Sequence, residues 1–165
     1  MIASDVAELY SELEHLGVRI WIDGGWGVDA LLKRQTRVHA DLDIAVEERD
    51  LAALCAVLKR RGYDAGDGAK SNVWNFVLTD SIGRKIDVHA FVLDLQGNGI
   101  LGPAELNQMY PAGALKGIGE IDKVPVRCVA PAFMVKFKTI YPPRDIDRAD
   151  IKAICERFGI ASPLE

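Results

Sequence analysis

Asp41-Leu42-Asp43-Ile44-Ala45-Val46 is the stretch that decides the fold, because acidic and apolar residues alternate in it with the period of a β-strand. On such a strand Asp41 and Asp43 share one face, while Leu42, Ile44 and Val46 point into a core. Two carboxylates this close repel each other unless a positive charge lies between them. Hard divalent cations such as Mg²⁺ prefer carboxylate oxygens. The stretch therefore predicts a half-buried strand whose polar face binds a metal ion.

A glycine pair lies upstream of this strand. Gly24-Gly25 follows the apolar run 20–22, and residues 26–33 are predicted to form a helix that begins on the pair. Glycines let backbone N–H groups approach a phosphate closely, and a helix N-terminus favours negative charge. Taken alone, an Asp-x-Asp is usually a solvated strand edge, and a Gly-Gly is usually a turn. Together the two motifs indicate metal-assisted chemistry on a nucleotide.

A second alternating run, 85–91, carries a third acid. Lys85, Asp87 and His89 share one face of this predicted strand. Charged residues are depleted in strands, so acids on the polar faces of two apolar strands favour a functional site over a solvated surface.

The order of these motifs resembles that of a known superfamily. Gly24-Gly25-Trp26, then Asp41-Leu42-Asp43, then Asp87 inside an apolar strand, resembles the polymerase-β-like nucleotidyltransferases. The longer strings 23–32 and 36–44 are similar to the small antibiotic nucleotidyltransferases that adenylylate lincosamides, with the aminoglycoside 2″-nucleotidyltransferases as near relatives. Segments 126–139 and 147–159 extend the resemblance over most of the chain. The resemblance implies an α+β fold, the minimal nucleotidyltransferase fold, in which a small mixed sheet flanked by helices carries a short C-terminal helical extension.

The resemblance also implies an enzyme and its chemistry. An adenylyltransferase of this kind transfers AMP from ATP to a hydroxyl of a small-molecule antibiotic such as a lincosamide or an aminoglycoside. Asp41 and Asp43 are then expected to bridge two Mg²⁺ ions and the triphosphate. Asp87 is expected to complete the metal site and to take the acceptor's proton as general base.

Further residues are candidates for binding the nucleotide. Arg37 is predicted to contact a phosphate, with a plain surface arginine as the alternative. His39 is expected either to contact the nucleotide or to hold Asp41 in place, and Asp29 either to bind the sugar or to cap local structure. The roles of His89, Lys136 and Lys138 stay open. The nucleotide-binding set is therefore Gly24, Gly25, Trp26, Asp29, Arg37 and His39.

Length and composition fit one domain. The chain has 165 residues, of which 49% are hydrophobic and 27% charged. We expect a single domain over 1–165, with a core at about 1–95 and the extension at about 96–165. The net charge of −4 and the pI near 5.4 argue against a nucleic-acid partner. The odd, widely spaced cysteines and the lack of a leader or long apolar run predict a cytoplasmic protein that does not bind membranes.

Periodicity and turn residues predict the order of the elements. The expected helices cover 5–16 with Ser4 as N-cap, 26–33, 48–61, 131–141 and 147–158, and the expected strands cover 18–22, 42–46, 73–78, 85–93 and 123–129. The segment 96–119 is predicted to be a loop with one short helix at 103–108.

A domain of this size has little surface with which to enclose an acceptor as well as a nucleotide. We therefore expect a homodimer with the acceptor near the subunit interface, to which Met109, Tyr110 and Ile118 contribute. Two other functions stay open. One is a toxin–antitoxin-type nucleotidyltransferase that modifies protein or tRNA, against which the acidic pI weighs for tRNA. The other is a non-catalytic nucleotide-binding domain, against which the presence of all three acids weighs.

Overall fold

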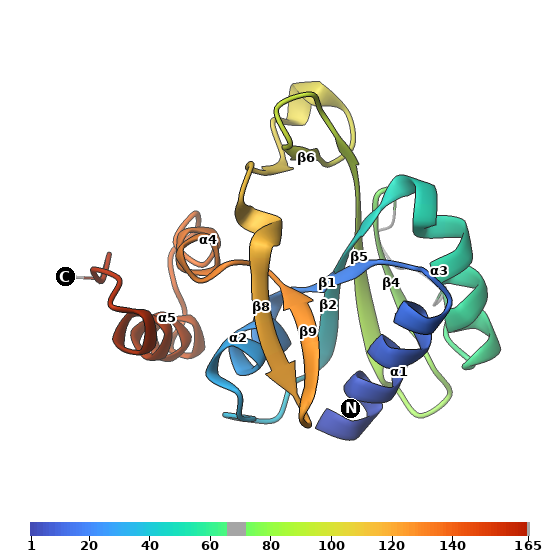
Figure 1. The fold of residues 1–165 in the computed structure, drawn as a ribbon, viewed down its shortest axis with the longest axis horizontal. Helices are drawn as coiled ribbons and strands as arrows, with labels where there is room; N and C mark the ends of the chain where they lie inside the picture. Colours follow the sequence, from blue (N-terminus) through green and yellow to red (C-terminus); the bar gives the residue numbers. More distant parts are fainter. Residues whose placement is uncertain (66–71, 165) are drawn as a thin grey trace.

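The computed structural model describes residues 1–65 and 72–164 as a mixed sheet with helices on both of its sides (Figure 1). The helices are α1 (Ala3–His15), α2 (Gly24–Leu32), α3 (Glu48–Arg60), α4 (Pro131–Phe137) and α5 (Asp145–Phe158). The strands are β1 (Ile20–Ile22), β2 (Asp41–Glu47), β3 (Asp64–Ala65), β4 (Asn75–Thr79), β5 (Lys85–Leu93), β6 (Gly99–Ile100), β7 (Met109–Tyr110), β8 (Gly117–Ile121) and β9 (Val124–Cys128). Helices α1 and α3 lie on one side of the sheet, and α2, α4 and α5 lie on the other. The predicted α+β class is confirmed.

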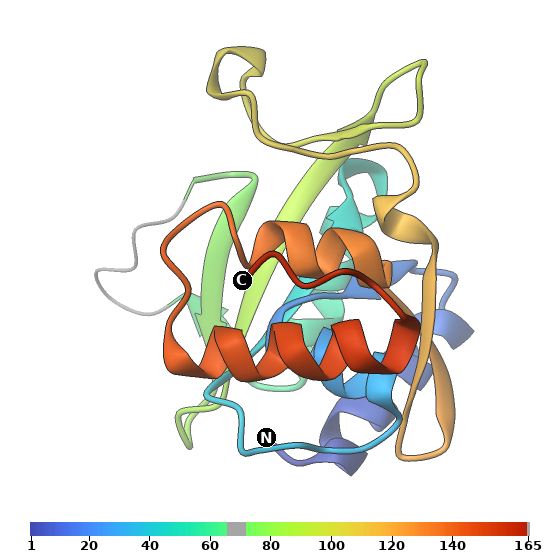
Figure 2. The same cartoon turned by 90° about the vertical axis from the view of Figure 1, so that its left-hand side faces the viewer.

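The strand order of the main sheet is β3-β4-β5-β2-β1-β9-β8. β2 pairs in parallel with β5 and antiparallel with β1, and β1 pairs in parallel with β9 through Ile22 and Cys128. The part of the chain after residue 95 therefore supplies two strands of the same sheet as well as the helices α4 and α5. The short strands β6 and β7 form a ladder that projects beyond the sheet from the end of β5 (Figure 2).

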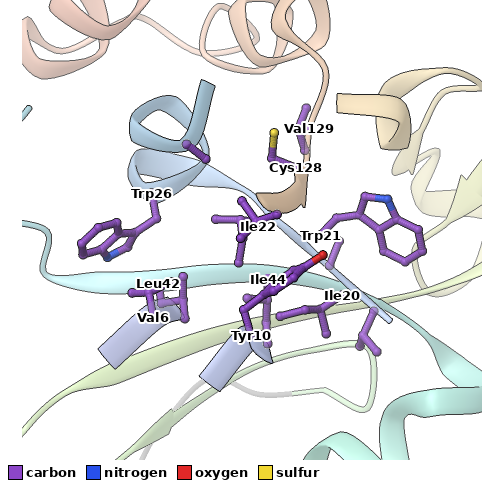
Figure 3. Close-up of a cluster of buried hydrophobic side chains, with 14 of the residues drawn as sticks. Val6, Tyr10, Ile20, Trp21, Ile22, Trp26, Leu42, Ile44, Cys128 and Val129 are labelled. Carbon is purple, nitrogen blue, oxygen red and sulfur yellow. The ribbon is translucent and has the colours of Figure 1, made fainter. Parts of the chain in front are cut away.

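The alternation in β2 appears in the structure as predicted. Leu42, Ile44 and Val46 are fully buried, whereas Asp41 is exposed and Asp43 is half-buried. Figure 3 shows Leu42 and Ile44 packed with Ile22 in the centre of the core. Burying each such side chain contributes about 2 kcal/mol. This burial sets the register that turns both acids of β2 to the opposite face.

Three helices begin upstream of the predicted residue: α2 begins at Gly24 instead of residue 26, and the other two are α1 and α5. α1 begins at Ala3, so Ser4 is not its N-cap; the Asp5 carboxylate instead accepts a hydrogen bond from the Ile2 backbone N–H at 3.0 Å. α5 begins at Asp145, because the Asp147 carboxylate accepts the Arg144 backbone N–H at 3.2 Å in the same way. In both helices an acid inside the first turn reaches back to the chain before it, which moves the start upstream.

The prediction of a loop over 96–119 is wrong in part. A short 3₁₀ turn at Ala104–Leu106 matches the expected helix, but the segment also contains β6, β7 and β8. Glycines at the start and in the middle of β8 conceal the strand pattern, since glycine is a poor strand former. A Cβ on Gly119 would lie 2.5 Å from the Ala30 backbone of α2. Glycine is needed there because α2 packs directly against β8.

Within the described residues, 1–65 and 72–164, no helix is long and apolar enough to cross a membrane.

Candidate active site

The polar faces of β2 and β5 bring the predicted acids together. In the parallel register, Asp43 lies directly opposite Asp87, and Asp41 lies opposite Lys85. Apolar neighbours of both strands are buried on the other face, so neither strand can rotate its carboxylates away from this side. The register thus brings the polar face of β2, with Asp41 and Asp43, beside the polar face of β5, with Asp87.

A group of metal-capable atoms forms around this pair. One ligand atom from each of Asp43, Asp87 and His89 lies within 4.8 Å of the other two. The His89 Nε2 atom is 3.9 Å from the nearest carboxylate oxygen of both acids, beyond hydrogen-bond distance. The Oδ1 atom of Asp87 is buried without a hydrogen-bond partner among the described residues. Asp41 lies outside this group, one pleat earlier on β2.

The pKa values of these residues report crowded negative charge. Burial raises the pKa of Asp87, and the nearby carboxylates of Asp43 and Asp41 raise it further. Burial and Asp43 likewise raise the pKa of Asp41. Burial alone would lower the pKa of His89, but Asp43 and Asp87 together raise it above its usual value. The chain thus holds carboxylates close together and compensates their charge only in part, through His89 near Asp87 and Lys85 near Asp41, which is an arrangement that a cation stabilises.

Each member of the glycine pair leaves room for a specific side chain. Gly24 has φ +57°, and a Cβ there would overlap the Asp43 carboxylate. A Cβ on Gly25 would overlap the His39 ring and lie 2.7 Å from the Arg37 guanidinium. The first turn of α2 therefore lies between the strand acids and the loop that leads into β2.

Asp23 is a half-buried acid of the site that was not predicted from the sequence. It is the N-cap of α2, and its side chain accepts hydrogen bonds from the Gly24 N–H at 2.7 Å and from the Tyr110 hydroxyl at 3.0 Å. Burial raises its pKa, and Asp43 adds to the effect. Its position directly before the glycine pair is the N-cap signal that would have found it. Tyr110 is itself buried, so it is not available for the dimer interface predicted for it.

Three of the predicted nucleotide contacts lie in the interior instead. Trp26 belongs to the buried cluster around Leu42 (Figure 3), and its ring packs on His39 with centroids 4.6 Å apart. His39 pairs with Asp29 and does not hold Asp41. Asp29 also accepts hydrogen bonds from the Thr36 backbone and hydroxyl, at 3.1 and 2.6 Å. These residues brace the loop before β2, which is the local role that was the alternative for Asp29.

Basic residues lie at the end of α4. Lys136 and Lys138 both line the cleft described below. Lys138 is buried, and its ammonium pairs with Asp150 at 3.0 Å and Asp147 at 3.3 Å. Because of these two ion pairs, Lys138 lies buried against α5 instead of extending into solvent from the end of α4.

A cleft of about 710 Å³ joins these parts. Asp23, Gly24, Asp43 and His89 line one wall, and the segment around β7 together with the end of α4 lines the other. Apart from the acids, the lining is apolar or uncharged except for the two lysines: Asn75, Leu101, Asn107, Gln108, Met109, Tyr110, Pro111, Met134, Phe137, Ile140 and Tyr141.

The sequence matches a known protein family. The profile of the aminoglycoside-2″-adenylyltransferase family matches residues 5–154. A lincosamide resistance protein of Staphylococcus haemolyticus is 42% identical over 50 residues, which are 30% of this chain and 31% of that protein. The match therefore spans about a third of that relative's length.

Two solved structures share the fold. The lincosamide antibiotic adenylyltransferase LnuA, solved with lincomycin bound, superposes with a TM-score of 0.76 at 22% identity, over 96% of this chain and 97% of that one. ANT(2″)-Ia, solved with adenylyl-2″-tobramycin, gives a TM-score of 0.74 at 19% identity, over 93% and 87% of the two chains. At this identity the likeness is one of fold.

Proposed function

The chain belongs to the aminoglycoside-2″-adenylyltransferase family, and from this premise we propose that it transfers AMP from ATP to a hydroxyl of a small-molecule antibiotic. The observation that carries the proposal is the grouping of Asp43, Asp87 and His89, of which Asp43 and His89 line the cleft beside the N-terminus of α2. Acids of two strands, a helix start and a roomy cleft are what nucleotidyl transfer requires of a protein.

The residues present fit a divalent metal. Asp43 and Asp87 offer carboxylate oxygens within 4.8 Å of each other, and one oxygen of Asp87 has no partner in the described chain. Oxygen ligands of this kind suit Mg²⁺. Asp43 and Asp87 would hold one ion, and Asp41 on the same strand face would help to hold a second. When bound, two such ions supply charge that activates the attacking hydroxyl and stabilises the leaving pyrophosphate.

The chain's own groups supply the rest of the proposed mechanism. The first turn of α2 offers backbone N–H groups and a partial positive charge to the phosphates, and Arg37 lies beside it. The raised pKa of Asp87 suits it to take the proton of the acceptor hydroxyl, since a base of higher pKa binds a proton more strongly. His89, whose pKa is raised by the same acids, would steady their negative charge.

The lining of the cleft favours an acceptor with an extended apolar surface. Facing the acids are Leu101, Met109, Phe137, Ile140 and Tyr141, together with amide side chains. The carboxylates among the described lining residues are Asp23 and Asp43, and two lysines lie nearby. A polycation such as an aminoglycoside would find few partners there, so lincosamides are the first acceptors to test.

Pyrophosphate release with ATP and Mg²⁺ over a panel of lincosamides and aminoglycosides tests the proposal. The expected product is an antibiotic whose mass has increased by one adenylyl group, formed by the wild type and by the surface control Asp145→Asn. Release of no pyrophosphate with any acceptor of the panel would contradict the proposed function.

We also propose a homodimer whose partner subunit helps to enclose the acceptor, in the cytoplasm. Ile118 on β8 is exposed and Met109 is half-buried, so both are open to a partner, in contrast to Tyr110. Light scattering at micromolar protein tests this, and a fully active monomer at that concentration would exclude a shared pocket.

A further inference from the structure

The first turns of α5 hold two acids that the packing removes from water. Asp147 has 0% of its surface exposed and Asp150 has 4%. Buried carboxylates are costly unless cations or hydrogen bonds compensate them. Asp145, the first residue of the same helix, is exposed and suffices for the favourable interaction with the helix dipole. The burial of the other two acids therefore has another cause.

Asp150 lies between two cations from distant parts of the chain. Its Oδ2 atom is 3.0 Å from the Lys138 ammonium and 3.4 Å from the Arg37 guanidinium. Lys138 ends α4, and Arg37 belongs to the loop before β2, more than a hundred residues away in sequence. One carboxylate thus joins the C-terminal helices to the loop that carries the predicted phosphate contact.

One of these cations lines the cleft, and the other lies against the start of α2, where the phosphates of a nucleotide would bind. Lys138 lines the cleft together with Gly24, and Arg37 lies against Gly25 in the first turn of α2. The Nε atom of Arg37 is buried without a hydrogen-bond partner among the described residues. Arg37 therefore keeps unused donor capacity beside the helix start, which is where a bound phosphate would accept it.

Asp147 anchors the other end of this charge network. It accepts hydrogen bonds from the Arg144 Nε at 2.8 Å and from Lys138 at 3.3 Å. Lys138 is thereby held by two carboxylates and retains one N–H bond for the cleft, since an ammonium has three. The network orders two long side chains that would otherwise lose rotamer freedom when a ligand binds.

We propose that Asp150 is a positioning residue for nucleotide binding, which holds Arg37 and Lys138 together near the start of α2, where the phosphates would bind. Through Asp150, α5 is part of the nucleotide site without touching the nucleotide. This inference rests on the proposed function, because it takes the ligand to be a nucleoside triphosphate. Without the carboxylate, Arg37 and Lys138 repel each other, Lys138 stays with Asp147, and Arg37 turns toward solvent.

Asp150→Asn tests the proposal, with Asp145→Asn as the matched control on the exposed side of α5. Asp150→Asn should raise the KM for ATP about tenfold and leave kcat and the acceptor KM within about twofold. Calorimetry with ATP and Mg²⁺ should show the same loss of affinity. A purely structural acid would lower the melting temperature without this split, and an unchanged or lower KM for ATP would overturn the proposal.

A double-mutant cycle with Arg37→Gln shows whether Asp150 acts through its partner. In the Arg37→Gln background, Asp150→Asn should change the KM for ATP by less than about twofold, because the interaction is already lost. Two full and additive effects would overturn the proposal.

Hydrogen exchange of the wild type keeps the test independent of any variant's folding. ATP with Mg²⁺ should slow amide exchange in α2 and also in the first turns of α5. Protection of α2 without any change in α5 would overturn the positioning role while leaving the proposed function intact. A wild type that does not bind ATP would remove both.

Discussion

The carboxylates of the strands and the carboxylates of α5 lie in opposite electrostatic surroundings within one molecule. Burial and neighbouring acids raise the pKa of Asp87 on β5. In contrast, Arg144 and then Lys138 lower the pKa of Asp147 to about 2, although burial opposes them. The difference shows which acids have cationic partners within the chain. Asp147 and Asp150 on the helix form ion pairs with cations of the chain. The negative charge of the strand acids is compensated only in part, and a bound cation would complete the compensation.

The largest expected effect comes from neutralising the strand acids. Asp43→Asn or Asp87→Asn should lower turnover at least about a hundredfold, because each removes a proposed metal ligand. Asp41→Asn is expected to act in the same direction. The metal-free Asp87→Asn protein should be at least as stable as the wild type at neutral pH, since repulsion is relieved. Pyrophosphate release and urea unfolding measure both effects, and more than a tenth of wild-type turnover would contradict the assignment.

Neutralising a helix acid should instead lower the stability of the fold. Asp147→Asn should lower the free energy of unfolding by about 2 kcal/mol at pH 7, because a carboxylate with a depressed pKa stabilises the fold when ionised. That stability is present above about pH 4, the pKa in the unfolded chain, and is lost as the pH falls toward about 2. Urea unfolding at pH 7 and pH 3 should therefore show a smaller difference between variant and wild type at the lower pH. An equal difference at both values would remove the ion-pair explanation.

Binding of Mg²⁺ should stabilise the protein measurably, because the ion compensates the negative charge of the strand acids. At ten times its Kd the ion should stabilise the protein by about 1.4 kcal/mol and raise Tm by about 3 °C. Because the pKa of Asp87 is raised, the metal-free protein loses stability as the pH rises from about 4, the pKa in the unfolded chain, through the raised pKa, and the gain from Mg²⁺ should grow over the same range. Differential scanning fluorimetry measures the shift. Asp145→Asn should retain it and Asp43→Asn should lose it, and equal shifts in both variants would place the ion elsewhere.

The surroundings of Asp23 are intermediate between those of the strand acids and those of the helix acids. Removing one of its hydrogen-bond donors should give the smallest effect. Its hydrogen-bond donors among the described residues are the Gly24 N–H and the Tyr110 hydroxyl, and it forms no ion pair with those residues. Tyr110→Phe removes one donor and should cost about 1 kcal/mol of stability. It should also raise the acceptor KM severalfold, because the segment around β7 loses its link to α2. A variant that matches the wild type in both respects would show that this hydrogen bond is dispensable.

Sequence reasoning succeeded where local patterns carry the structure. The alternation in β2 and β5 predicted which residues face the core, and the strands predicted at 73–78 and 85–93 correspond to β4 and β5, which pair with each other. It failed where partners come from far along the chain. Nothing local to Asp150 indicates Arg37, and nothing local to Asp23 indicates Tyr110.

The sequence by itself therefore determined the five helices, the strands β1, β2, β4, β5 and β9, and the alternation that places Asp41 and Asp43 on one face of β2 and Asp87 on the polar face of β5, because hydrophobic periodicity acts over a few residues. Only the tertiary structure decided which charges meet. It paired His39 with Asp29 instead of Asp41, buried Trp26 in the core and set Lys138 between two acids. The physical reason is that electrostatic partners are chosen by distance in space, which the packing of α2, α4 and α5 against the sheet establishes only after the chain has folded.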